Sequence, residues 1–308
     1  MVVKMKNVLV VGGNGFIGKN IIESLLNHDI NVSVYDRTKF EKIQNSYVGD
    51  IVNDVNFNNY FNNIDAVIYL VTTVSPKKSM DNPNEAYEKD VPLLIKTLEC
   101  CKKNNIKRLI FASSGGAIYG DVGINKARED SFNQPINNYG ICKLTCEKIL
   151  QMYNVLYGME NISLRISNPY GEGQNSNTGV GVITTFADYI MSGKDINIYG
   201  DGSIVRDFIH VKDVADAFYL SLLYKYSNEI IPVFNIGSGV GLSINDIIQL
   251  VEDTFKKKAN INYLDGRLFD VKYNVLDIKK AQDYLNYSPN PNETEKIKQY
   301  LKKRYLGD

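Results

Sequence analysis

The stretch NVLVVGGNGFIG, residues 7–18, decides the fold of this chain. Its first five residues are mainly apolar and β-branched, which predicts a buried strand, and apolar residues at helical spacing follow the glycines. A strand, a glycine-rich turn and a helix in this order form the βαβ unit that binds dinucleotides, with the pyrophosphate at the helix N-terminus. We expect Gly12 to allow the tight turn, Gly15 to let the backbone approach a pyrophosphate, and Gly18 to let the helix pack on the strand.

A carboxylate at the end of the next expected strand indicates which dinucleotide is bound. Residues 32–35 form this strand, and Asp36 follows it, eighteen residues after Gly18. A carboxylate here accepts hydrogen bonds from the adenosine ribose and repels a 2′-phosphate, which predicts NAD. The neighbouring Arg37 can accommodate that phosphate, so NADP stays an alternative.

Strand and helix patterns then alternate. Residues 66–71 and 108–113 are mainly apolar runs typical of buried parallel strands, and residues 162–167 form a further expected strand. Residues 84–104 and 139–157 carry apolar side chains at helical spacing. Repeated βα units predict an α/β fold, a Rossmann-type doubly wound parallel sheet with a smaller C-terminal substrate-binding lobe.

The alternation becomes irregular after Pro169. We therefore expect residues 1–170 to form the NAD-binding domain and residues 171–308 mainly the substrate-binding lobe, with segments near 205–240 returning to the main domain. The expected strands of this part are 205–211 and 232–237, and its expected helices are 183–192, 211–223, 244–255, 278–285 and 293–305.

The composition excludes several classes of protein. The formal net charge is zero, so we expect a small-molecule partner and no nucleic acid. The four cysteines form no CxxC pair, and His28 and His210 have no ligand-spaced neighbours, so we expect reduced thiols and no metal. No apolar run approaches the ~20 residues of a membrane span, and residues 1–6 are too short for a signal peptide. These features predict a cytoplasmic protein without a membrane anchor.

The segment YGICK at 139–143 offers the clearest chemistry. Tyr139 and Lys143, four positions apart, lie on one face of the expected helix. There the ammonium can favour the phenolate and hold a bound sugar ring, so Tyr139 is a candidate general acid/base. The alternative is a chance pair on a helix surface, because the chain has 21 tyrosines.

Several further motifs occur in a familiar order: GGNGFIG at 12–18, YD at 35–36, GDI at 49–51, SSGGAIYG at 113–120, SNPYG at 167–171, RDFIHVKDVADAF at 206–218 and FNIGSG at 234–239. With YGICK, they cover almost the whole chain. The chain resembles the extended short-chain dehydrogenase/reductase superfamily and, within it, the UDP-glucose 4-epimerase-like NAD-dependent epimerase/dehydratase family.

The resemblance implies roles for residues that bind the cofactor. Tyr139 would be the acid/base, and Lys143 would bind the nicotinamide ribose. Asp50 and Ile51 would flank the adenine. The implied cofactor-binding residues are Gly12, Gly15, Phe16, Ile17, Gly18, Asp36, Arg37, Asp50, Ile51, Leu70, Val71, Thr72, Tyr139 and Lys143.

The resemblance also implies a nucleotide-sugar site. Asn168 would contact the sugar diphosphate, Tyr199 would stack on the base, and Arg206 and Arg267 would clamp the diphosphate and its ribose. The implied substrate-binding residues are Ser114, Asn168, Val182, Tyr199, Arg206, Arg267 and Asp270. Each has a structural alternative: Asn168 can shape a turn, Tyr199 can pack the lobe, and Arg206 can pair with Asp207 or Asp213.

One departure from the family concerns the proton relay. Relatives commonly place a serine or threonine two to four positions after the end of the strand expected here at 108–113. This chain has Gly115, Gly116 and Ala117 at those positions. Ser114 is the nearest hydroxyl and our candidate third catalytic residue, with Ser113 and Thr72 behind it.

Three functions follow from this pattern. The leading hypothesis is an NAD-dependent 4-epimerase of a nucleotide-diphosphate hexose, UDP-glucose/galactose or the N-acetyl forms, acting by transient oxidation at C4. The alternative is an NAD(P)H-dependent reductase of an NDP-4-keto-6-deoxy sugar, and the third hypothesis is a non-catalytic NAD-binding protein. The resemblance further implies a homodimer formed through the helices expected at 84–104 and 139–157.

Overall fold

A seven-stranded sheet forms the centre of the computed structural model, which describes residues 5–175, 181–266 and 271–307. The strands are ordered β10-β6-β5-β4-β1-β2-β3, and every neighbouring pair is parallel. They are β1 (Asn7–Val11), β2 (Asn31–Asp36), β3 (Ser46–Val48), β4 (Ala66–Tyr69), β5 (Arg108–Ser114), β6 (Ile162–Ile166) and β10 (Val233–Ile236). The order reverses at β1, as in a doubly wound dinucleotide-binding sheet.

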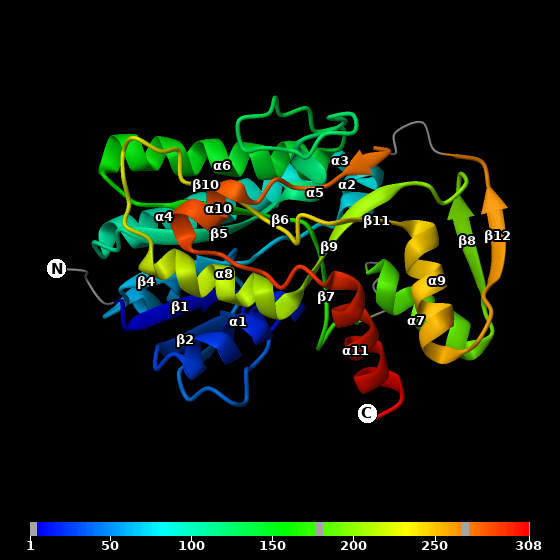
Figure 1. Cartoon of the computed structure of the whole chain (residues 1–308). Coiled ribbons are helices and arrows are strands. Elements are labelled where there is room, and N and C mark those ends of the chain that lie inside the picture. Colours follow the sequence, from blue (N-terminus) through cyan, green and yellow to red (C-terminus); the bar gives the residue numbers. More distant parts are fainter. Residues whose placement is uncertain (1–4, 176–180, 267–270, 308) are drawn as a thin grey trace.

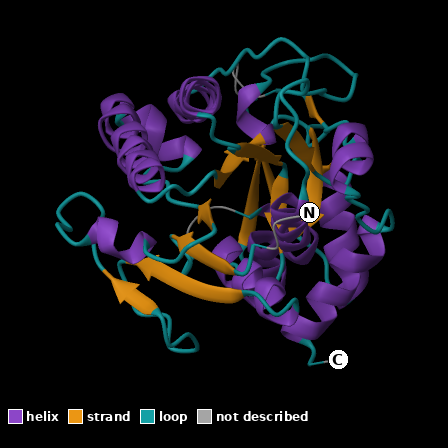
Figure 2. Ribbon diagram, turned by 90° about the vertical axis from the view of Figure 1, so that its left-hand side faces the viewer, coloured by secondary structure: helices purple, strands orange, loops and turns teal. Residues whose placement is uncertain are grey.

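Helices cover both faces of this sheet (Figures 1 and 2). One face packs against α1 (Phe16–Asn27), α8 (Val211–Leu223) and α10 (Lys279–Leu285), and the other against α4 (Val91–Lys103) and α6 (Asn138–Tyr157). Successive residues of a strand point to opposite faces, so Val8 and Val10 enter one core while Leu9 and Val11 enter the other. The predicted Rossmann-type parallel sheet is confirmed.

A smaller body of strands and helices lies at one end of the sheet (Figure 1). Its central strand β9 (Val205–His210) pairs with β11 (Gly241–Ser243), β13 (Tyr273–Asn274) and β7 (Asn168–Tyr170). A separate parallel pair joins β8 (Asp195–Tyr199) to β12 (Asn260–Leu264). Helices α7 (Val182–Ser192), α9 (Ile244–Phe255) and α11 (Glu293–Tyr305) enclose a third core with these strands.

The chain crosses between the two bodies more than once. After β9 it enters α8, which packs against α1, and then β10, which pairs with β6 at the edge of the main sheet. The remaining short elements are η1 (Phe57–Phe61), α2 (Pro76–Asp81), α3 (Pro83–Glu85), the π-helical turn η2 (Ala86–Asp90) and α5 (Gly115–Ile118). The helix expected at 84–104 is thus present, with the π-helical turn at its start.

Candidate active site

The glycine-rich loop between β1 and α1 is built closely around its backbone. Gly12 has φ +85°, in the left-handed region that favours glycine. A Cβ atom on Gly18 would lie 2.5 Å from the carbonyl oxygen of Gly13, whereas one on Gly15 would meet nothing nearer than the Gly12 oxygen at 3.7 Å. Gly18 therefore lets α1 rest on the loop backbone, and Gly15 faces open space.

This loop has the features that a dinucleotide pyrophosphate requires. The first turn of α1 contains no acidic side chain, so its backbone N–H groups, at Phe16 and Ile17 among others, present a positive helix end. Asp36, at the end of β2, accepts a hydrogen bond from the Asn14 amide at 2.9 Å, and Arg37 beside it is exposed. The residues fit NAD, with a carboxylate placed next to the glycine loop.

The other candidate cofactor residues follow the neighbouring strands. Val71 lies against Gly12, where a Cβ atom would come within 3.2 Å of its side chain, and Leu70 is half-buried beside it. Asp50 is exposed, while the Ile51 side chain is buried in the core under α4 and α6. Carboxyl ends of parallel strands meet at one edge, so these segments converge on the edge where dinucleotides bind.

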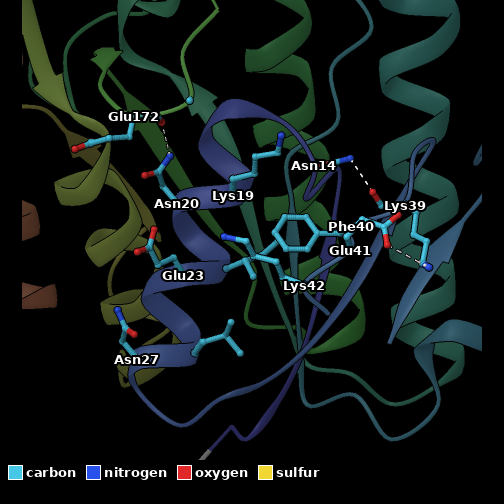
Figure 3. Close-up of a pocket in the computed structure, with 13 residues that line it drawn as sticks. Asn14, Lys19, Asn20, Glu23, Asn27, Lys39, Phe40, Glu41, Lys42 and Glu172 are labelled. Carbon is cyan, nitrogen blue, oxygen red and sulfur yellow. Dashed lines mark hydrogen bonds and ion pairs between the residues drawn. The ribbon is translucent and has the colours of Figure 1, made fainter. Parts of the chain in front are cut away.

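A cavity of about 600 Å³ borders the glycine loop. Figure 3 shows it between α1 and residues 39–42, with the Phe40 ring projecting towards α1 and the carbonyl of Lys39 bound by the Asn14 side chain. Asn14 lines this cavity, but none of the predicted site residues does. The cavity is therefore separate from the tyrosine–lysine pair.

Helix α6 begins beside the sheet and brings that pair to the same edge. Asn137 caps the helix by accepting a hydrogen bond from the Gly140 amide at 2.8 Å, and the buried Ser79 hydroxyl accepts one from the Tyr139 amide at 3.1 Å. The first turn, which carries Tyr139, is thus fixed at two backbone amides.

Lys143 lies one turn further along α6, directly below Tyr139. Its side chain is only 5% exposed, and its Nζ donates to the carbonyl oxygen of Ala112 on β5 at 2.9 Å. The same nitrogen lies 4.6 Å from the centroid of the Phe111 ring and 5.6 Å from that of Tyr139. The structure therefore brings the predicted pair together, with the ammonium close to the phenol ring.

The three hydroxyls considered for the proton relay differ in availability. Ser113 donates to Glu147 at 2.6 Å in the core, and Thr72 donates to Asp90 at 2.9 Å. Ser114 is half-buried, and its hydroxyl has no partner among the residues that the structure describes. Of the three, only Ser114 is available to a ligand.

The glycines after Ser114 differ in the space beside them. A Cβ atom on Gly115 would lie 2.6 Å from the side chain of the buried Leu276 and 3.1 Å from the backbone of Arg165. One on Gly116 would meet only the Asn168 side chain, at 3.9 Å. The space beside Gly116 is therefore open, whereas the space beside Gly115 is filled by the Leu276 side chain.

The predicted substrate residues come from the smaller body. Asn168 donates to the Asp207 carbonyl at 2.8 Å, and Val182 begins α7. Tyr199 is exposed at the end of β8, and the Arg206 guanidinium on β9 donates to the carbonyls of Val205 and Val271. Arg267 and Asp270 lie outside the described residues.

The two carboxylates considered as partners of Arg206 have other contacts. Asp207 is fully buried and accepts hydrogen bonds from Ser238, Gly239 and Leu276, and burial raises the pKa of this carboxyl. Asp213 forms an ion pair with Lys296. These contacts give both aspartates structural roles.

Two groups of residues near the pair were not anticipated from the sequence. One is Ser79, which holds the start of α6; no sequence pattern pointed to it. The other is the buried pair of Glu147 and Arg165, joined at 2.7 Å. Its only sequence signal is that Glu147 follows Lys143 by four positions and so shares the helix face of Tyr139.

Two predicted absences concern the rest of the molecule. Within residues 5–175, 181–266 and 271–307, no group of three or more His, Cys, Asp or Glu side chains could hold a metal ion. Across the same residues, no helix has the length and apolar character needed to span a membrane.

These features define a class of enzyme. A glycine-rich turn at the first strand of a parallel Rossmann sheet, an acidic residue after the second strand, and a Tyr-Lys pair on the helix after the fifth characterise NAD-dependent enzymes of the short-chain dehydrogenase/reductase type.

The comparisons identify the family. Residues 8–237 match the NAD-dependent epimerase/dehydratase family, and the chain belongs to it. The chain is 34% identical to a Methanocaldococcus jannaschii protein provisionally named UDP-glucose 4-epimerase, over 96% of this chain and 97% of that one. It is 31% identical to dTDP-4-dehydro-6-deoxyglucose reductase of Escherichia coli, over 93% of each.

A solved structure agrees with this assignment. The UDP-glucose 4-epimerase of Thermotoga maritima, crystallised with UDP-glucose, superposes with a TM-score of 0.90 at 29% identity, over 98% of this chain and 99% of that one. The predictions of the family, of NAD as cofactor and of an enzyme of the nucleotide-sugar epimerase type are confirmed at the level of class.

Proposed function

We propose that the chain is an NAD-dependent 4-epimerase of a nucleotide-diphosphate hexose, UDP-glucose/galactose or the N-acetyl forms. The observation that carries this proposal is the placement of Lys143. Its ammonium donates to the Ala112 carbonyl and lies 5.6 Å from the centroid of the Tyr139 ring, at the same carboxyl edge of the sheet as the glycine loop. The relatives named UDP-glucose 4-epimerase support the substrate class.

The residues of this chain would handle the proton at the sugar O4. Tyr139, as phenolate, would accept it during oxidation and return it during reduction. Lys143 would hold the nicotinamide ribose and favour the phenolate by its charge. Ser114 would share the O4 proton through its available hydroxyl. Bound NAD would supply the redox chemistry, by accepting the C4 hydride and returning it to the opposite face of the 4-keto sugar.

The body formed mainly by residues 171–308 would bind the rest of the substrate. Asn168 would contact the diphosphate, Tyr199 would stack on the base, and Arg206 would clamp the phosphates. Val182, Arg267 and Asp270 complete the proposed substrate set. We retain the division near residue 170 as part of this proposal.

The test uses the purified protein with UDP-sugars and no added cofactor, with product identified by chromatography. Tyr139→Phe removes only the acid/base oxygen, so we expect kcat to fall by about 10²–10⁴-fold. Tyr157→Phe, at the exposed end of the same helix, is the matched control and should keep the wild-type kcat. A Tyr139→Phe variant that epimerises at the wild-type rate would contradict the assignment of Tyr139 as the acid/base.

Two observations favour a second candidate, a reductase of an NDP-4-keto-6-deoxy sugar. The Escherichia coli relative is such a reductase by name, and the family hydroxyl is absent at Gly115 to Ala117. A reductase donates a proton only once, so it can dispense with a second hydroxyl. Turnover of a keto sugar with consumption of NAD(P)H, and none of UDP-sugars alone, would support this candidate. Bound NAD with no turnover of either would instead support a non-catalytic protein.

Location and assembly are part of the same proposal. The four cysteines are free thiols in the core, which suits a reducing cytoplasm. Helix α6 exposes Met152, Val155 and Leu156, and such apolar side chains support a homodimer in which α4 and α6 face a second copy. Sedimentation of the protein as a monomer at micromolar concentration would contradict the dimer.

A further inference from the structure

A buried ion pair lies on the face of α6 that carries Tyr139 and Lys143. The side chain of Glu147 is 0% exposed and that of Arg165, on β6, is 3% exposed. Arg165 donates to Glu147 through Nε at 3.0 Å and through Nη2 at 2.7 Å, the two-pronged geometry that suits a guanidinium and a carboxylate. Glu147 follows Lys143 by one helical turn, as Lys143 follows Tyr139.

The pair connects the helix to two adjacent strands. Arg165 of β6 is the register partner of Ser113 of β5, and Ser113 also donates to Glu147, at 2.6 Å. One turn earlier on the helix, Lys143 donates to the carbonyl of Ala112, the residue before Ser113. Two successive turns of α6 are therefore bonded to two successive residues of β5.

Stability alone does not account for such a pair. Burying two charges costs several kcal/mol each, and replacing a buried ion pair with well-packed apolar residues is often neutral or stabilising. Apolar contacts, however, tolerate sliding, whereas directional hydrogen bonds specify one position of the helix along the sheet. The position that these bonds specify is that of α6 relative to the end of β5.

We propose that Glu147 is a positioning residue, which holds α6 in the one register on β5 that places the Tyr139 phenol and the Lys143 ammonium correctly beside Ser114. The proposal rests on the epimerase function proposed above. Ser114 directly follows Ser113, so the bond from Ser113 to Glu147 fixes the candidate proton donor and the helix of the candidate acid/base to each other. Glu147 contacts no reacting atom and acts through this geometry alone.

The experiment compares two substitutions of the same kind. Glu147→Gln removes the charge, and with it the two-pronged acceptor of Arg165. Glu160→Gln is the matched control, because Glu160 pairs with the buried Arg108 at the opposite end of the same two strands. A displacement near 1 Å at a reacting group can cost about 100-fold in rate, so we expect kcat for UDP-sugar epimerisation to fall by about 100-fold in Glu147→Gln. KM should stay within about threefold, and Glu160→Gln should match the wild type in both constants.

A second variant separates positioning from stability. In the double variant Glu147→Met/Arg165→Met, apolar side chains of similar length replace both charges. We expect its thermal midpoint to stay near that of the wild type and its kcat to remain low, because the register bonds are gone. A stable double variant with the wild-type kcat would overturn the proposal, and so would Glu147→Gln with the wild-type kcat.

The outcome for the wild-type protein distinguishes the two proposals. If the wild type epimerises and the Glu147 variants do so equally well, the positioning role alone is refuted. If the wild type epimerises no nucleotide sugar, the proposed function is refuted and the positioning role with it.

Discussion

Replacing Gly18 by alanine tests how α1 meets the glycine loop. The added Cβ atom would lie 2.5 Å from the Gly13 oxygen, 2.7 Å from its carbonyl carbon and 2.8 Å from its Cα, against about 3.4 Å for ordinary contact. All three atoms are backbone, so no side chain can rotate away and the helix must move by about 0.9 Å. Overpacking of this kind costs about 3 kcal/mol at the upper end of its range, and the better helix propensity of alanine offsets about 1 kcal/mol.

The net loss of about 2 kcal/mol converts to a change in the thermal midpoint. An unfolding entropy of about 2.1 cal/mol/K per residue gives about 0.65 kcal/mol/K for a chain of this length, so the midpoint should fall by about 3 °C. Differential scanning calorimetry of the protein freed of NAD measures this fall. The control is Gly15→Ala, whose Cβ atom would meet nothing nearer than 3.7 Å and should leave the midpoint within about 1 °C.

Adding NAD should reveal an effect of Gly15→Ala that is absent without the cofactor. The methyl group of Gly15→Ala would occupy the space that faces the pyrophosphate, so we expect at least about tenfold weaker NAD binding. At an NAD concentration of about 100 times the wild-type Kd, the stabilisation by NAD would shrink from about 2.7 to about 1.4 kcal/mol, or from about 4 °C to about 2 °C. An unchanged midpoint in Gly18→Ala, or an unchanged NAD increment in Gly15→Ala, would refute these assignments.

Three further substitutions probe the space after β5 and the pH dependence of stability. Gly115→Ser should lower the thermal midpoint, because its Cβ atom would lie 2.6 Å from Leu276, whereas Gly116→Ser should leave the midpoint unchanged; equal midpoints would contradict the packing argument. Burial lowers the pKa of His210 in the folded protein, despite the attraction of the Glu172 carboxylate 3.2 Å away. The stability that the neutral His210 contributes is therefore complete above the unfolded pKa of about 6.5. It is lost as the pH falls from there towards the lower folded pKa. His210→Gln should therefore lose less thermal stability than the wild type between about pH 7.5 and about pH 5.5, and parallel losses in calorimetry would count against this assignment.

The central sheet could be predicted from the sequence because both of its faces are buried. Strands such as β1 and β4 then consist almost wholly of apolar residues, and the pattern can be recognised within each segment. The pairing of β8 with β12 was not predictable in this way. Four of the five residues of β12 are exposed, and their partners lie 65 positions earlier in the chain, so only tertiary contact selects the pairing.

The residues of the candidate site also differ in how far the sequence predicts them. The glycine loop and the pair of Tyr139 and Lys143 are local patterns, and the sequence placed them on the correct turn and helix. The contact of Glu147 with Arg165 joins residues 18 positions apart through two different elements, and a lone glutamate on a helix gives no sign of its partner. Sequence reasoning therefore finds candidate reacting groups more readily than the groups proposed to hold them in place.

The space beside Gly116 bears on the choice between epimerase and reductase. Epimerisation requires the 4-keto sugar to present both faces in turn, so its site needs room for the ring to turn, whereas a reductase needs only one orientation. A Cβ atom on Gly116 would meet only the Asn168 side chain, at 3.9 Å, so the space beside Gly116 is open, next to the residue proposed to contact the diphosphate. We expect this open space to give a bound sugar ring room to turn. The open space beside Gly116 therefore favours the proposed epimerase, whereas the missing hydroxyl at Gly115 to Ala117 favours the reductase. Turnover of UDP-sugars without added cofactor decides between the two.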